Sequence, residues 1–224
     1  DGSVLLTEGG KGAVLFDPAF VEDPVAFVSY TRTAADSIEP NTIVTNMAMT
    51  SDLIAVAINQ EYVFSGFRSM RVVLKDATTT RWDIRFDRVE FPLRGSLSFS
   101  QDGTRLYAVV SRFVSGNIGP FRTEILEFDA LTGAHALIFA GPVGQRFAGM
   151  AVDPQGRVYT HNFDRNDKAI YRLNRATSQL EAIAPRLPEH VSGLQGFANG
   201  MGIDRYGRIY VAMLELDGKN RLYR

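Results

Sequence analysis

The sequence repeats itself at a nearly fixed interval, and this repeat restricts the fold more than any other feature. Residues 97–107, 150–159 and 201–210 share a short apolar stretch, a turn with glycine and a second stretch that ends in tyrosine. The turn glycines Gly103, Gly156 and Gly207 are separated by 53 and 51 residues. An interval of about 50 residues is typical of propeller blades and is long enough for four strands.

Each unit continues with an apolar stretch that ends in Asp or Asn, followed three residues later by threonine. Asx and Thr side chains hydrogen-bond the backbone that follows them and so close tight turns. A last apolar stretch completes the unit, and almost no segment has the period of an amphipathic helix. The turn-closing pairs are Asp76 with Thr79, Asp129 with Thr132 and Asn174 with Thr177. The aromatic residues expected to pack between sheets are Tyr107, Tyr159, Tyr210 and Trp82.

These units predict an all-β fold, a β-propeller of four-stranded antiparallel blades with about five blades visible. Radial closure removes exposed sheet edges, which is how propellers avoid pairing with other chains. We expect a single domain over residues 1–224 and a ring of five or six blades. Because the chain starts and stops inside a unit, it is expected to be a segment of a longer protein. The predicted blades span about 38–92, 93–143 and 144–190, with partial blades at 1–37 and 191–224.

The composition argues against several classes of function. There are 24 Lys plus Arg against 25 Asp plus Glu, so the net charge is −1 and no overall field attracts nucleic acid. No apolar run approaches the roughly 18 residues of a membrane-spanning helix, which argues against membrane insertion. The chain has no cysteine, which excludes disulfides and thiolate sites. Together with the segment-like ends, this predicts a monomeric domain in an extracellular or periplasmic protein.

Turns of a propeller alternate between two faces, and the long connections share one of them. Here this face is called the long-loop face, and the face with the short glycine and Asx turns is called the hairpin-turn face. Loops on rigid scaffolds commonly carry binding groups, and residues 111–121 form one such loop. The polar residues expected nearest the channel on the long-loop face are Glu8, Asn59, His161, Asn162, Asn199 and Glu215. Such oxygen donors with one imidazole suit calcium more than zinc, whereas the alternative is that they are solvated loop ends.

The hairpins at residues 147–159 and 197–210 resemble the blade signature of NHL-repeat propellers and the gluconolactonase/regucalcin-like family. The resemblance covers about three blades. For lactonase-like members it implies a divalent metal at the channel mouth. The implied ligands are a Glu near the chain start, Asn residues that precede Gly in blade openings, and an Asp that ends a second strand. Asn199-Gly200 matches one Asn position, whereas the equivalent openings read Ala148-Gly149 and Gly95-Ser96.

Two hypotheses about function follow. The favoured one is a noncatalytic binding or scaffold module of a larger extracytoplasmic protein, which binds a protein, a glycan or a small ligand on its long-loop face. The alternative is a metal-dependent lactonase-like or lyase-like enzyme, in which Glu8, Asn199 and His161 act as ligands or acid/base groups. The module is favoured because the sequence lacks a Gly-x-Ser-x-Gly nucleophile motif, and because Gly9-Gly10-Lys11-Gly12 lacks P-loop spacing.

Overall fold

The computed structural model describes residues 4–8, 12–16, 25–29, 41–62, 67–76, 79–89, 96–116, 119–162, 169–184, 197–204, 206–214 and 220–224. Every regular element in these ranges is a β-strand, which confirms the predicted all-β fold. A helix long and apolar enough to cross a membrane is not found among them.

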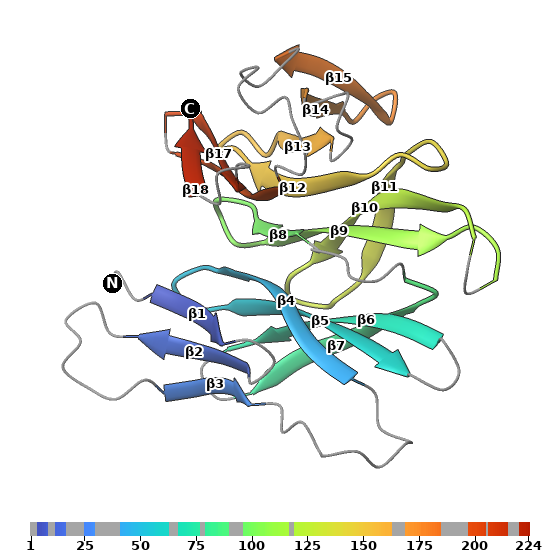
Figure 1. Ribbon diagram of the computed structural model, residues 1–224. Coiled ribbons are helices and arrows are strands. Elements are labelled where there is room, and N and C mark those ends of the chain that lie inside the picture. Colours follow the sequence, from blue (N-terminus) through green and yellow to red (C-terminus); the bar gives the residue numbers. More distant parts are fainter. Residues whose placement is uncertain are drawn as a thin grey trace.

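The strands form five antiparallel sheets, shown in Figure 1. The first sheet contains β1 (Val4–Glu8), β2 (Gly12–Phe16) and β3 (Val25–Ser29). The second contains β4 (Asn41–Met49), β5 (Ile54–Tyr62), β6 (Phe67–Lys75) and β7 (Thr80–Asp87). The third contains β8 (Ser96–Phe99), β9 (Arg105–Phe113), β10 (Phe121–Asp129) and β11 (His135–Ala140). The fourth contains β12 (Phe147–Val152), β13 (Val158–Asn162), β14 (Ile170–Asn174) and β15 (Gln179–Ala184). The fifth contains β16 (Phe197–Ile203), β17 (Ile209–Leu214) and β18 (Asn220–Tyr223).

Within each sheet, strands that are neighbours in sequence are also neighbours in space. The first strands of the last four sheets, β4, β8, β12 and β16, contact one another in that order. Figure 1 shows the sheets following one another around a common centre. This is the blade arrangement of a β-propeller. Among the described residues no strand pairing joins the first sheet to the fifth, so the blade boundaries and the size of a closed ring remain predictions.

The repeated hairpin is held together by an aspartate. The Oδ1 of Asp153 accepts the backbone N–H groups of Gln155 and Arg157, each at 2.9 Å. Its Oδ2 accepts the Arg157 Nε–H at 2.5 Å and the Tyr159 hydroxyl at 3.0 Å. Burial raises the pKa of Asp153, but these hydrogen bonds outweigh burial and lower it overall. Asp204 makes the same four contacts in the fifth sheet, so this part of the repeat is structural.

The turns between third and fourth strands form as the sequence predicts. Asp76 Oδ1 accepts Thr79 N at 2.7 Å, and Asp129 Oδ1 accepts Thr132 N at 2.9 Å. Asn174 Oδ1 accepts the backbone N–H of Thr177 at 3.3 Å. Because the side chain supplies the acceptor in all three turns, the chain reverses without leaving these N–H groups unpaired.

Trp82, on the fourth strand β7, connects the second sheet to the third. Its indole stacks on Phe128 with 5.5 Å between ring centroids, and its Nε1–H donates to the Ala130 carbonyl at 3.2 Å. Below the indole lies Gly133, whose φ is +73° and whose added Cβ would lie 2.9 Å from Trp82 Cγ. Only glycine suits that turn, because it combines a left-handed backbone with the close approach of a rigid ring.

Candidate functional site

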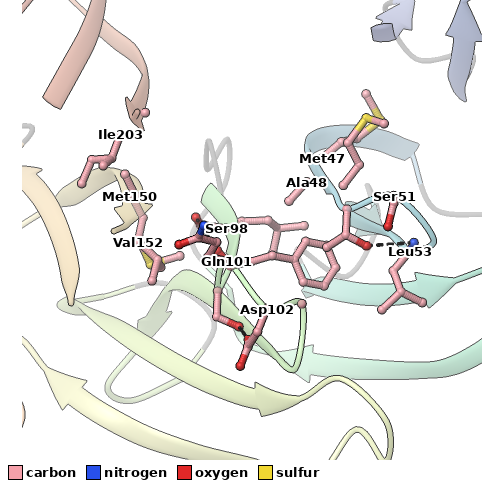
Figure 2. Close-up of a pocket in the computed structure, with 18 of the residues that line it drawn as sticks. Met47, Ala48, Ser51, Leu53, Ser98, Gln101, Asp102, Met150, Val152 and Ile203 are labelled. Atoms are coloured by element: carbon pink, nitrogen blue, oxygen red, sulfur yellow. Dashed lines mark hydrogen bonds between the residues drawn. The ribbon is translucent and has the colours of Figure 1, made fainter. Parts of the chain in front are cut away.

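The inner strands enclose an open cavity of about 650 Å³ on the hairpin-turn face. Part of its apolar lining repeats from sheet to sheet. In each of four inner strands, the lining residue lies three positions before the residue whose backbone N–H bond closes the following hairpin. These residues are Met47, Leu97, Met150 and Met201. Figure 2 shows Met47 on one side of the opening and Met150 with Ile203 on the other. The cavity therefore lies where the inner strands of the second to fifth sheets meet, and we call it the channel cavity.

Two charged groups beside this opening are engaged by neighbouring residues. Asp102 Oδ1 accepts the Ser100 hydroxyl at 2.6 Å and the Thr104 N–H at 3.0 Å, and these bonds, the Ser100 bond foremost, lower its pKa. Arg81 forms an ion pair with Asp76, with 3.4 Å between Nε and Oδ2. Ser51, Asp52 and Gln101 also line the cavity, and no hydrogen bond or ion pair of their side chains is found among the described residues.

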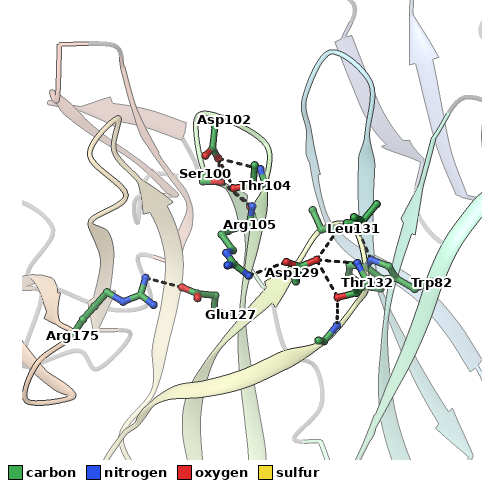
Figure 3. Close-up of polar contacts among 12 residues, drawn as sticks. Trp82, Ser100, Asp102, Thr104, Arg105, Glu127, Asp129, Leu131, Thr132 and Arg175 are labelled. Atoms are coloured by element: carbon green, nitrogen blue, oxygen red, sulfur yellow. Dashed lines mark hydrogen bonds and ion pairs between the residues drawn. The ribbon is translucent and has the colours of Figure 1, made fainter.

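The hairpin-turn face also joins the third sheet to the fourth through charged side chains, as Figure 3 shows. Arg175, in the turn after β14, forms an ion pair with Glu127 on β10, with 2.7 Å between Nη1 and Oε2. It also donates to the Tyr107 hydroxyl at 3.3 Å. Burial raises the pKa of Glu127, but the hydrogen bonds from Arg175 and Tyr107 lower it overall. Tyr107 thus packs between sheets, as expected from its recurrence.

The residue that precedes Met47 and the residue that precedes Leu97 each connect their inner strand to the next one. Asn46 Oδ1 accepts the backbone N–H of Leu97 at 3.1 Å. Ser96 Oγ accepts the backbone N–H of Met150 at 2.8 Å. The corresponding residue of the fourth sheet is Gly149, which has no side chain to make such a bond.

His161, on β13, fills the space beside Gly149. A Cβ added to Gly149 would lie 2.4 Å from His161 Nε2, and the Gly149 φ is +31°. The imidazole is only 1% exposed, and its Nε2 has no hydrogen-bond partner within the described part of the chain. Desolvation lowers the pKa of His161 to about 4, so the ring is neutral at pH 7. It therefore packs as a neutral, buried ring against the Gly149 backbone.

Of the six residues predicted near the channel, the structure describes the side chains of three. Asn59 lies on β5 and is 1% exposed, and Asn162 ends β13 and is 5% exposed. His161 and Asn162 are consecutive, with 3.4 Å between the imidazole Nδ1 and the Asn162 carbonyl oxygen. The strands that carry Glu8 and Asn199 are described but their side chains are not, and Glu215 lies outside the described residues. Their joint role in ligand binding therefore remains a prediction.

A second, smaller cavity of about 230 Å³ lies where the second sheet meets the third on the long-loop face. Three arginines and a buried glutamate line it. Arg112 and Arg122 are register partners on β9 and β10, and Glu124 follows two residues after Arg122. The lining residues are Asp87, Arg88, Arg112, Phe113, Val114, Arg122 and Glu124. We call this cavity the arginine pocket.

Glu124 orients two of the arginines. Its side chain is 3% exposed, and Oε2 lies 3.0 Å from Arg112 Nε while Oε1 lies 3.1 Å from Arg122 Nε. Both contacts are made by Nε, and no hydrogen bond from a terminal nitrogen of Arg112 or Arg122 is found among the described residues. A carboxylate this deeply buried keeps both arginine side chains in place, because separating them would leave its charge uncompensated.

Arg88 reaches the arginine pocket from the other sheet. Its carbonyl accepts the Phe113 N–H at 2.8 Å, and the next residue, Val89, bridges to Arg112. Its φ is +58°, a left-handed conformation that is unfavourable for a residue with a side chain. The Arg88 guanidinium has no ion pair or hydrogen bond to any residue that the structure describes. Since Asp87 is paired with Arg85 at 2.8 Å, the pocket carries an excess of positive charge.

Sequence reasoning did not single out these arginines, although it did predict binding groups on the long-loop face. The available signal was the pair Arg112 and Arg122 at the two ends of the loop 111–121. The third arginine carried no local signal, because Arg88 belongs to the preceding sheet and meets the others only in the folded chain.

No protein-family model matches the sequence, and no curated protein matches it significantly. Solved structures do match the fold. The structure is similar to a chain in the crystal structure of a nidogen/laminin complex, with 11% identity, coverage of 98% of this chain and 77% of that chain, and a TM-score of 0.58. It is also similar to a protein of unknown function from Bacteroides caccae, with 14% identity, coverage of 98% and 70%, and a TM-score of 0.51. The β-propeller domain of the Trilobed protease from Pyrococcus furiosus matches with 12% identity, coverage of 82% and 57%, and a TM-score of 0.45. The fold is a β-propeller fold.

Proposed function

We propose that the chain is a noncatalytic propeller module that binds its ligand on the long-loop face. The observation that carries this proposal is the arginine pocket, where three arginines line one cavity between two sheets. The hairpin-turn face offers a larger cavity, in which Asp102 is held within its turn and Arg81 is paired with Asp76. From the sequence alone, the proposal also places the module in a larger extracytoplasmic protein.

The alternative function, a metal-dependent lactonase-like or lyase-like enzyme, needs several ligands that converge on one ion. Within the described residues, no group of three or more His, Asp or Glu side chains is placed to hold a metal. His161 is buried and packs against the Gly149 backbone. The other residues of that hypothesis, Glu8 and Asn199, have side chains outside the described set. Elemental analysis and thermal unfolding with and without EDTA test this alternative, because a bound ion stabilises the native state.

Hydrogen exchange in the presence of candidate ligands tests the proposed function. The probes are inorganic phosphate, sodium sulfate and a neutral trisaccharide such as chitotriose, each at millimolar concentration. We expect at least one probe to slow exchange at residues 88–89, 112–114 and 121–124, because ligand binding stabilises the backbone that it contacts. Slowed exchange confined to the inner-strand hairpins, near residues 49–53 and 99–104, would instead locate binding at the channel and refute the proposal. The same refutation follows if neither these probes nor an acidic peptide slows exchange on the long-loop face.

A further inference from the structure

We infer that the arginine pocket binds the oxyanion group of a small anionic ligand: a phosphate, a sulfate or a carboxylate. This inference rests on the proposed function, because it names the ligand class of the same site. The occupant is defined by three features of the described residues: the excess positive charge, the donors left open by Glu124 and the volume of the cavity.

The donors are organised before any ligand arrives. Glu124 contacts Arg112 and Arg122 through their Nε atoms, at 3.0 and 3.1 Å. The terminal nitrogens of both guanidiniums stay available among the described residues. A planar guanidinium presents its N–H groups in a fork that matches two oxygens of an oxyanion, and such charge-assisted bonds are the strong ones. Holding both forks on a buried carboxylate lowers the entropy lost when a ligand binds.

The third arginine lines the cavity from the end of the second sheet. Arg88 carries no partner among the described residues and keeps a left-handed backbone, which costs about 1 kcal/mol for a residue with a Cβ. Asn or Gly would suit this backbone better. Residues held in such conformations concentrate at ligand-binding sites, where the side chain is needed for binding. The bond from Phe113 N to the Arg88 carbonyl, at 2.8 Å, fixes this conformation.

The charge and the size of the pocket define the class of ligand. The lining contains three arginines against Glu124 and Asp87, and Asp87 is also paired with Arg85, so positive charge predominates and a cation is repelled. A volume of about 230 Å³ is below the usual range for drug-sized ligands and fits one oxyanion group with a small substituent. The whole chain carries a net charge of −1, so no overall positive field attracts anions to the molecule.

Calorimetric titration tests the inference with inorganic phosphate, sodium sulfate and sodium acetate at low ionic strength. Arg88→Asn removes one guanidinium while suiting the left-handed backbone, so it retains the fold. We expect about a tenfold or greater rise in Kd for this variant, since one hydrogen bond to a charged group contributes about that factor. Arg88→Lys keeps the charge but loses the fork, and its Kd should lie between those of the wild type and Arg88→Asn.

The matched control is Arg81→Asn, which makes the same change of charge at the start of β7, the strand that Arg88 follows. Arg81 lines the channel cavity on the hairpin-turn face, so its loss should leave Kd within twofold. Equal weakening by Arg81→Asn and Arg88→Asn would show that binding follows net charge, and would overturn the inference.

The three probes separate the sources of the oxyanion. Tight binding of phosphate or sulfate with weak acetate binding indicates a tetrahedral group, and comparable acetate binding indicates a carboxylate. If no anion binds while the neutral trisaccharide slows exchange at residues 112–114, the oxyanion inference fails and the proposed binding face stands. If an acidic peptide binds at this face and the small anions do not, the inference of a small ligand is also overturned.

Discussion

Gly149→Ala is the substitution that tests the packing around the channel most sharply. The new Cβ would lie 2.4 Å from His161 Nε2, and the Gly149 φ of +31° is unfavourable for alanine. Holding alanine in this left-handed backbone conformation costs about 1 kcal/mol of stability. Displacing the enclosed imidazole ring costs a further ~1–3 kcal/mol, which is the usual cost of overpacking a core. We therefore expect the free energy of unfolding to fall by about 2–4 kcal/mol. For a domain of this size that lowers Tm by roughly 4–16 °C.

Urea unfolding followed by circular dichroism measures this loss, with Gly144→Ala as the matched control. Gly144 has a φ of +84° and no atom within 4 Å of an added Cβ, so it isolates the backbone cost of about 1 kcal/mol. His161→Ala in the Gly149→Ala background should recover part of the loss, because the clash is removed. Equal losses at the two glycines, or strictly additive effects of Gly149→Ala and His161→Ala, would refute this account of the packing.

Two further predictions concern the same inner region. The pKa of His161 is lowered from 6.5 to about 4 by burial, so the unfolded chain binds more protons between these pH values, and stability should decrease as the pH falls from 7 to 4. At about 1.4 kcal/mol per pKa unit, the full loss of stability is about 3 kcal/mol. Urea unfolding midpoints at pH 7 and pH 4.5 measure this loss. His161→Gln should remove most of this pH dependence. Ser96→Ala leaves the buried Met150 N–H without its acceptor at 2.8 Å and should cost about 1–3 kcal/mol. Ser98→Ala, whose hydroxyl makes only a 3.5 Å contact with the Phe99 carbonyl, should cost much less; equal costs would contradict the assigned role of Ser96.

The parts of the fold that depend on local chemistry could be predicted from the sequence. A turn closed by an Asx side chain needs only residues within three positions, as Asp129 and Thr132 show. The glycine turns and the strand repeat follow from equally short-range patterns. The recurrence of tyrosine at one position of the repeat predicted that these tyrosines are structural. The hydrogen bond from the Tyr159 hydroxyl to Asp153 explains why this tyrosine recurs together with the aspartate.

The candidate site could be predicted only in part, because it depends on contacts between sheets. The long-loop face was expected to bind, but the arginine pocket requires the register that sets Arg112 opposite Arg122. It also requires the bridge that joins Val89, next to Arg88, to the neighbouring sheet. His161 shows the same limit. Its imidazole suggested a ligand, yet its burial beside Gly149 follows from a bulge between β12 and β13 that the sequence does not reveal.

A crystal structure of the protein grown or soaked with sodium selenate would test the central claim most directly. Selenate is a tetrahedral oxyanion, and the anomalous signal of selenium locates it without ambiguity. The account predicts a peak within hydrogen-bond distance of Arg88 and of the terminal nitrogens of Arg112 or Arg122. That peak should be absent from Arg88→Asn crystals. A peak in the channel cavity on the hairpin-turn face, or an empty arginine pocket at saturating selenate, would contradict it.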